Sequence, residues 1–161
     1  MLFAFGSMRL RTSQIPQSSE KVVTIHTGTE HKPTALAPTR KVLLLEDRSD
    51  YRNVLREYLV SCSYHVTSVP SGIEGLREIM KGRFDIILCD MMMPKMGGEM
   101  FYWAVTRVRP AARESFIFFT GHKNNPAIEF FFKRINARVL YKPFKLSALD
   151  AVIHEIFLKL G

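Results

Sequence analysis

Five polar residues each follow a short apolar run of the sequence, and their types suit the binding of a metal ion and a phosphoryl group. They are Glu46 and Asp47 after Lys41–Leu45, Asp90 after Phe84–Cys89, Thr120 after Ser115–Phe119, and Lys142 after Arg138–Tyr141. Three carboxylates at one rim repel one another unless a cation neutralises them, which predicts a hard divalent ion with oxygen ligands. Mg²⁺ is the natural candidate, with ligands from Asp47, Asp90 and the backbone carbonyl of Met92. Glu46 is expected to contribute through bound water.

The same residues predict phosphoryl transfer. Its barrier falls mainly through positioning of the reactants and neutralisation of charge on the phosphoryl oxygens. Asp90 is the expected nucleophile. Thr120 and Lys142 are expected to hold two of the phosphoryl oxygens, so that a hydroxyl, an ammonium and a metal ion surround one carboxylate.

Each of these residues, taken alone, has an ordinary structural explanation. An acidic pair after a strand is favoured by the dipole of the helix that follows. Asp90 before Met-Met-Met-Pro can begin a turn, and Lys142 with Pro143 can end a strand. Their joint placement at the ends of apolar runs favours one shared site over these separate explanations.

The elements that must position these residues are predicted from alternating patterns after Arg40. Apolar runs, with Tyr64–Val69 as the second, alternate with segments of helical period. This alternation predicts an open, doubly wound α/β fold with a parallel sheet, helices on both faces and a site at the carboxyl ends of the strands. The inward helical residues are expected to be Val54, Leu55, Tyr58, Leu59 and Cys62; Ile73, Leu76, Ile79 and Met80; Phe101, Ala104, Val105 and Val108; Ile128, Phe131, Phe132 and Ile135; and Leu149, Val152, Ile153, Ile156, Phe157 and Leu160.

Composition limits the possible classes of protein. The chain has 161 residues, 47% of them hydrophobic, which suits one ordinary domain with its own core. Residues 1–40, rich in Ser, Thr, Gln and Pro, are predicted to be a flexible linker or tail, and residues 41–161 the domain. No apolar run is long enough to cross a membrane, and only two cysteines occur, so a cytoplasmic location is expected. The net charge of +8 is scattered without aromatic interleaving, so no nucleic-acid partner is expected.

Residues 41–161 resemble the receiver domains of two-component response regulators. The matching stretches are Val42–Asp47, Asp85–Gly97, Phe118–Gly121 and Leu140–Phe144, and the run Asp-x-x-Met-Pro-x-Met-x-Gly from Asp90 to Gly98 is the most specific of these signals. The resemblance implies a flavodoxin-like fold with five parallel strands in the order 2-1-3-4-5. It also implies a Mg²⁺-dependent aspartyl phosphate at Asp90 and a histidine kinase or histidine phosphotransfer protein as donor.

The resemblance extends to the receivers at the carboxyl terminus of hybrid histidine kinases. It implies a domain that catalyses its own phosphorylation and dephosphorylation but is mainly regulatory. No output domain follows Gly161, so a separate downstream protein is expected as the effector. The alternatives are a relay, a phosphate sink or the regulatory tail of a kinase. Dimerisation through the fourth helix, fifth strand and fifth helix is common in the family. Here it would require acidic partners for Arg134, Arg138 and Lys145, and the local candidates are Glu129, Asp150 and Glu155.

The sequence departs from the family pattern at two positions. Val139 stands where many receivers have an aromatic switch residue, three positions before the lysine, so a binding module that signals without phosphorylation is the alternative function. Arg48 directly follows the acidic pair and is expected to point to water, with an ion pair to Glu46 as the alternative. In this family the positions of Met92 and His122 border the phosphoryl group and tune its hydrolysis.

Overall fold

Five short strands form one parallel sheet in the computed structural model, which describes residues 39–160. The strands are β1 (Lys41–Leu45), β2 (His65–Val69), β3 (Ile86–Asp90), β4 (Phe116–Thr120) and β5 (Arg138–Tyr141). Their order is β2-β1-β3-β4-β5, which confirms the predicted fold and strand order. Of the predicted linker at residues 1–40, residues 1–38 lie outside the described residues.

Among the described residues, four α-helices and one 3₁₀ helix lie between successive strands, and a fifth α-helix follows β5. They are α1 (Ser49–Ser61), α2 (Gly72–Lys81), α3 (Gly98–Val108), η1 (Pro110–Ser115), α4 (Pro126–Ile135) and α5 (Leu146–Leu160). Local capping sets several helix ends. The side chain of Ser71 accepts a hydrogen bond from the backbone N–H of Glu74 and caps α2, and Asn125 caps α4 in the same way. Asn136 ends α4 in the left-handed conformation, with φ of 52°.

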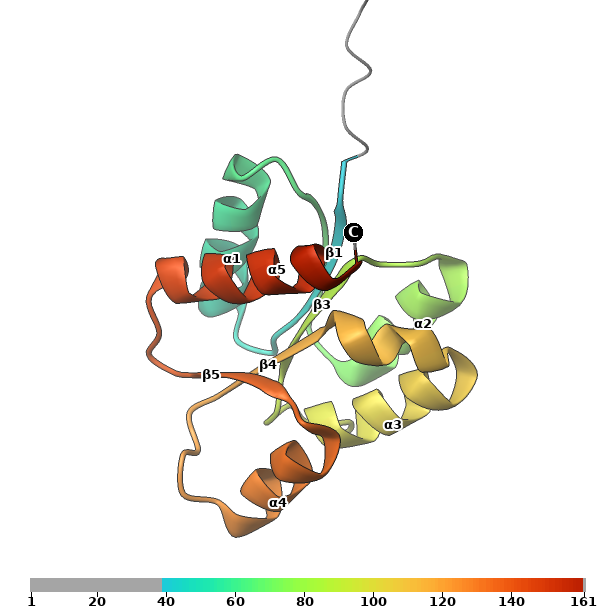
Figure 1. The fold of residues 1–161 in the computed structure, drawn as a ribbon, viewed down its shortest axis with the longest axis vertical. Coiled ribbons are helices and arrows are strands. Elements are labelled where there is room, and N and C mark those ends of the chain that lie inside the picture. Colours follow the sequence, from blue (N-terminus) through green and yellow to red (C-terminus); the bar gives the residue numbers. More distant parts are fainter. Residues whose placement is uncertain (1–38, 161) are drawn as a thin grey trace, which may run out of the picture. The chain divides into compact units, whose positions relative to one another are not determined.

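The helices cover both faces of the sheet, with α1 and α5 on one face and α2, α3 and α4 on the other (Figure 1). Side chains alternate between the two faces along each strand. Thus Val42 and Leu44 of β1 pack toward α1 and α5, whereas Leu43 and Leu45 pack toward α2 and α3. The core strands β1, β3 and β4 are therefore apolar at nearly every position, as expected for a sheet covered on both faces.

Several predicted element bounds and inward positions were wrong. The second, third and fourth strands begin one or two residues later than the apolar runs suggested. Five residues predicted to face inward are exposed or lie at the margin of the core: Val54, Cys62, Ile73, Met80 and Val108. They flank the buried stripe of their helix or lie at its end, so their side chains reach solvent. The side chain of Leu160 lies outside the described residues.

The register of the sheet brings the ends of four strands to one edge. Leu45 pairs with Cys89, Asp90 with Phe119, and Thr120 with Tyr141. The residues that follow β1 and β5, and the last residues of β3 and β4, therefore share the carboxyl edge. The strand order reverses between β1 and β3. In folds of this kind, ligands bind at the carboxyl ends of the strands at such a point. Within residues 39–160, no helix combines the length and apolar character needed to cross a bilayer.

Candidate functional site

Three carboxylates meet at the carboxyl edge of the sheet. One oxygen from each of Glu46, Asp47 and Asp90 lies within 4.8 Å of the others. Glu46 is fully buried, Asp90 is 5% exposed and Asp47 is half-buried. The structure thus brings together the three acidic residues that the sequence predicts to share a site.

Lys142 is the cation in direct contact with this cluster. Its Nζ donates to Glu46 Oε2 at 2.7 Å and to Asp90 Oδ2 at 2.9 Å. The backbone N–H of Lys142 donates to the carbonyl of Thr120 at 2.8 Å, which ties the end of β5 to the end of β4. The ammonium therefore pairs with two of the three carboxylates, and the cluster keeps an excess of negative charge.

Burial controls the ionisation of groups around the cluster. Loss of hydration raises the pKa of Glu46 above its ordinary value, and the charge of Asp90 raises it further, while the hydrogen bond from Lys142 opposes this rise. The pKa of the Cys89 thiol is raised well above its usual value, first by complete burial and then by the neighbouring carboxylates. Cys89 therefore remains a protonated packing residue.

The loop after Asp90 explains the Asp-x-x-Met-Pro-x-Met-x-Gly run. The backbone N–H of Met92 donates to Asp90 Oδ1 at 3.2 Å, so each oxygen of the carboxylate has a donor. A Cβ on Gly98 would lie 2.8 Å from the carbonyl oxygen of Asp90, and one on Gly97 would lie 2.9 Å from that of Met91. Glycine is required at both positions because the loop folds back onto its own backbone.

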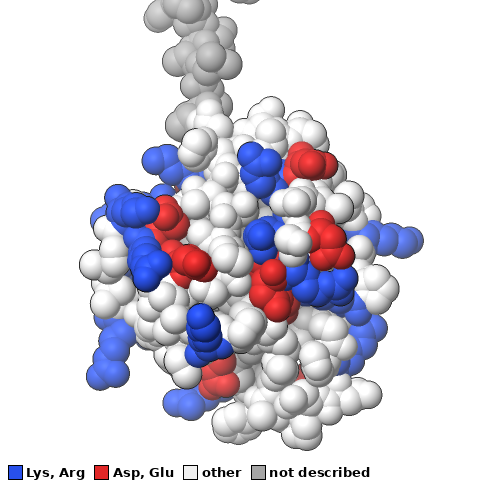
Figure 2. Space-filling model, turned by 180° about the vertical axis from the view of Figure 1, so that it is seen from behind, with Lys and Arg blue, Asp and Glu red and all other residues white. Residues whose placement is uncertain are grey.

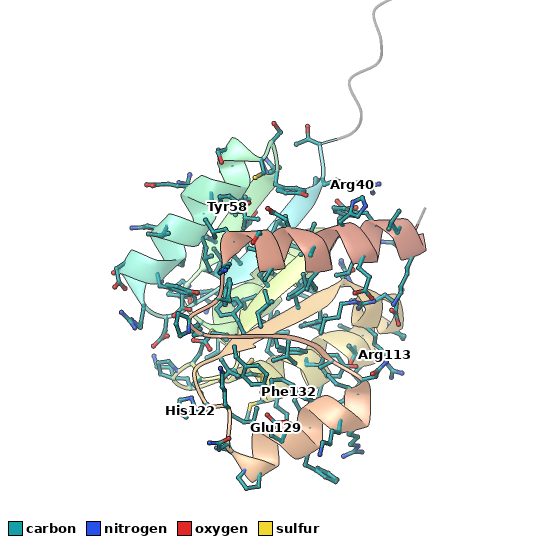
Figure 3. The ribbon with its side chains drawn as sticks, turned by 60° about the vertical axis from the view of Figure 1, so that its left-hand side comes forward. Arg40, Tyr58, Arg113, His122, Glu129 and Phe132 are labelled. Atoms are coloured by element: carbon teal, nitrogen blue, oxygen red, sulfur yellow. The ribbon has the colours of Figure 1, made fainter. Side chains whose placement is uncertain are left out.

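Thr120 and the following loop complete the edge. Thr120 is fully buried, and its Oγ1 accepts a hydrogen bond from the backbone N–H of His122 at 3.1 Å. The side chain of His122 is exposed at the start of the loop that leads to α4 (Figure 3). The structure thus places Thr120 on the predicted edge, with its hydroxyl already engaged by the backbone of that loop.

Two arginines near the acidic pair have different roles. The exposed guanidinium of Arg48 pairs with Asp50 at 3.0 Å, as expected for a side chain that points to water. Arg52, which the sequence analysis missed, donates from its Nη1 to the backbone carbonyls of Glu46 at 2.6 Å and Asp47 at 3.1 Å. Its position one turn into α1 was the available signal. Arg52 holds the loop that presents the acidic pair.

Sequence reasoning also missed an aromatic wall beside Lys142. The rings of Tyr51 and Phe119 each have their centroid 4.8 Å from the Nζ of Lys142. Burial and the negative charges of Glu46 and Asp90 raise the pKa of Tyr51 to about 12, so its phenol stays neutral at physiological pH. The charged residues were recognised because they follow apolar runs. Tyr51 and Phe119 instead lie within a helix and an apolar strand, where an aromatic residue carries no sign of a site.

The donor set of the cluster fits Mg²⁺. Carboxylate and backbone oxygens are the hard ligands that this ion prefers, and the excess negative charge is what a divalent cation would neutralise. Asp47 and Asp90, with the backbone carbonyl of Met92, would hold the ion, and Glu46 would act through bound water. The carboxylates lie close enough together for this purpose.

Comparison with known proteins identifies the family. Residues 42–154 match the sequence family described as the response regulator receiver domain. The chain belongs to this family. It is a receiver domain of two-component signalling, and its fold is that of the chemotaxis protein CheY and similar receivers.

Similar receivers occur both alone and within longer proteins. The receiver protein CpdR of Brucella abortus is 30% identical over 120 residues, which are 74% of this chain and 98% of CpdR. The sensor kinase CckA of the same organism is 31% identical over 131 residues, but these cover 80% of this chain and only 14% of the kinase. The solved structure of CheY4 from Vibrio cholerae superposes with a TM-score of 0.65 at 28% identity, covering 73% of this chain and 98% of CheY4.

Proposed function

We propose that this receiver accepts a phosphoryl group on Asp90 in a Mg²⁺-dependent reaction and passes the signal to a partner protein. The observation that carries the proposal is the environment of the Asp90 carboxylate. It is buried, it has a donor on each oxygen, and it lies beside two further carboxylates suited to a divalent ion. A purely structural ion pair at Asp90 would need only Lys142. The presence of Glu46 and Asp47 beside this pair therefore supports a metal-assisted transfer.

The proposed donor is the phosphohistidine of a histidine kinase or histidine phosphotransfer protein. One carboxylate oxygen of Asp90 attacks phosphorus while the P–N bond to the imidazole breaks, and the imidazole keeps the electron pair and takes up a proton. Lys142, already 2.9 Å from Asp90 Oδ2, stays beside the phosphoryl oxygens, and the Thr120 hydroxyl is the second expected donor. Mg²⁺, when bound, would supply positive charge that offsets the negative charge of the transferring group.

The wider setting belongs to the same proposal. Residues 41–161 form the receiver, residues 1–40 are a linker, and the protein acts in the cytoplasm as a regulatory domain that catalyses its own phosphorylation and dephosphorylation. A separate protein serves as effector. On the face drawn in Figure 2, basic side chains lie among acidic ones instead of forming one continuous basic surface, which supports a protein partner over nucleic acid.

A homodimer through α4, β5 and α5 remains a subordinate proposal, because the acidic residues that it would use have partners within the chain. Glu129 accepts from Tyr141 at 2.6 Å, and Glu155 accepts from Lys159 at 2.7 Å. Asp150 accepts at 2.5 Å from Tyr58, which reaches from α1 toward α5 (Figure 3). A charge-paired dimer would have to exchange these contacts.

The second candidate function is a protein-binding module that does not need phosphorylation. Val139 favours it, because a half-buried aliphatic side chain packed against the core replaces the aromatic ring whose rotation reports phosphorylation in many receivers. The charged cluster favours the first function, since a module without chemistry has no use for three mutually repelling carboxylates.

The test is intact-mass analysis after incubation with phosphoramidate and Mg²⁺. We expect a gain of one phosphoryl group that is lost with a chelator and in Asp90→Asn. Asp50→Asn is the matched control, because it makes the same change on an exposed carboxylate. If neither phosphoramidate nor a panel of phosphorylated kinases and phosphotransfer proteins modifies the wild-type chain, the phosphorylation-independent module becomes the better function.

A further inference from the structure

The ammonium of Lys142 lies between two kinds of partner. On one side are the carboxylates of Glu46 and Asp90, and on the other are the rings of Tyr51 and Phe119, with both centroids 4.8 Å from Nζ. Both ring distances are within the range in which a cation is attracted to an aromatic face. The family's charged residues account for the first side of this arrangement only.

The aromatic side is a closed cluster of three rings, Tyr51, Phe119 and Phe144, which we name the aromatic box. Its centroid separations are 6.3 Å between Tyr51 and Phe119, 6.2 Å between Tyr51 and Phe144, and 6.2 Å between Phe119 and Phe144. The rings come from α1, β4 and the segment between β5 and α5. Phe119 is buried within the sheet, so it gives the box a rigid base, and Tyr51 closes it from the helix.

We propose that Tyr51 is a positioning residue that holds the Lys142 ammonium where it serves both the free and the phosphorylated carboxylate of Asp90. This inference rests on the proposed phosphoryl transfer. When Asp90 is phosphorylated, negative charge moves outward from its carboxylate to the phosphoryl oxygens, and the ammonium must follow it. A flexible lysine held only by carboxylates would remain with Glu46.

The ring faces keep the ammonium from remaining with Glu46, because they attract the cation without adding a negative charge. A fourth carboxylate in the place of Tyr51 would compete for the ammonium and increase repulsion within the cluster. The rings instead restrict the four-carbon stem of Lys142 and keep its charge directed toward Asp90. The hydroxyl of Tyr51 has no part in this arrangement, so a phenylalanine would serve as well.

Two variants separate the ring from the hydroxyl. Tyr51→Leu removes the ring, and Tyr51→Phe keeps it. Tyr64→Leu is the matched control, because it removes a half-buried tyrosine ring from the segment between α1 and β2. This ring stacks on Phe157 of α5, and the two centroids are 6.4 Å apart. Thermal unfolding of each variant shows whether a change in rate reflects loss of folded protein.

The first measurement is the rate of Asp90 phosphorylation at varied phosphoramidate concentrations with Mg²⁺ present. We expect Tyr51→Leu to lower the maximal rate roughly tenfold, the change that corresponds to about 1.4 kcal/mol, at an unchanged half-saturating donor concentration. Tyr51→Phe and Tyr64→Leu should match the wild type. Equal slowing in Tyr51→Phe and Tyr51→Leu, or full activity in Tyr51→Leu, would overturn the proposal.

The second measurement needs no phosphorylation. Ring currents shift the resonances of protons above an aromatic face upfield, so the ε-methylene protons of Lys142 in a ¹³C-lysine-labelled protein should be upfield, and assignment follows from Lys142→Arg. Tyr51→Leu should move this resonance downfield, and Tyr51→Phe should not. If the wild type accepts no phosphoryl group, the proposed function fails, and this shift alone decides whether the ring holds the ammonium. An unchanged shift in Tyr51→Leu would refute it.

Discussion

Replacement of Lys142 by Met should destabilise the protein through the carboxylates that it leaves behind. The substitution keeps an unbranched stem but removes an ammonium bonded at 2.7 Å to the fully buried Glu46 and at 2.9 Å to Asp90. Removal of one partner from a buried ion pair costs about 3–5 kcal/mol. We expect the free energy of unfolding to fall by about 3 kcal/mol, because burial already favours protonation of Glu46, which relieves part of the cost.

Mg²⁺ should recover part of this loss. A ligand that binds only the folded state at a hundredfold excess over its Kd adds about 2.7 kcal/mol to the free energy of unfolding. The gain should be larger in Lys142→Met than in the wild type, because the ammonium no longer competes with Mg²⁺ for Glu46 and Asp90. Urea unfolding followed by circular dichroism, with Mg²⁺ and with a chelator, measures both effects. Lys145→Met, at an exposed position three residues away, is the control.

Two results would refute this reasoning. If Lys142→Met in chelator lies within about 0.5 kcal/mol of the wild type, the buried carboxylates do not depend on the ammonium. If Mg²⁺ stabilises the wild type and the variant equally, the ammonium and the metal ion do not share the same oxygens. Either result would also weaken the assignment of Mg²⁺ to this cluster.

Further predictions concern the face of the sheet that α2, α3 and α4 cover. Tyr141→Phe removes the hydrogen bond to Glu129, 2.6 Å long, and should lower the free energy of unfolding by about 1 kcal/mol in urea titrations, whereas no change would mean that water replaces the bond without cost. Gly75→Ala places a Cβ 2.5 Å from Leu45 Cδ2, so overpacking of about 1–3 kcal/mol should outweigh the gain in helix propensity. Gly82→Ala, whose Cβ meets no atom within 4 Å, should be nearly neutral, and equal thermal midpoints for the two variants would contradict this explanation.

The fold could be predicted wherever the local pattern of apolar residues indicates which positions are buried. β1 and β5 have the predicted bounds, because each apolar run is enclosed by charged residues or followed by Lys-Pro. The helical stripes were less reliable. Val54 is 57% exposed and Met80 is 71% exposed, although both lie beside buried residues of their helices. An apolar stripe shows which side of a helix faces the core, whereas the sheet beneath it decides how wide the contact is.

The sequence by itself determined which side chains meet at the carboxyl edge, because the ends of parallel strands share an edge whatever the details of packing. Only the tertiary structure decided how they pair. Lys142 bonds to residues 96 and 52 positions away, and this contact depends on the register and spacing of strands that no local pattern encodes. The same holds for Tyr51, which looks like an ordinary residue of a helix until the fold places its ring over the ammonium.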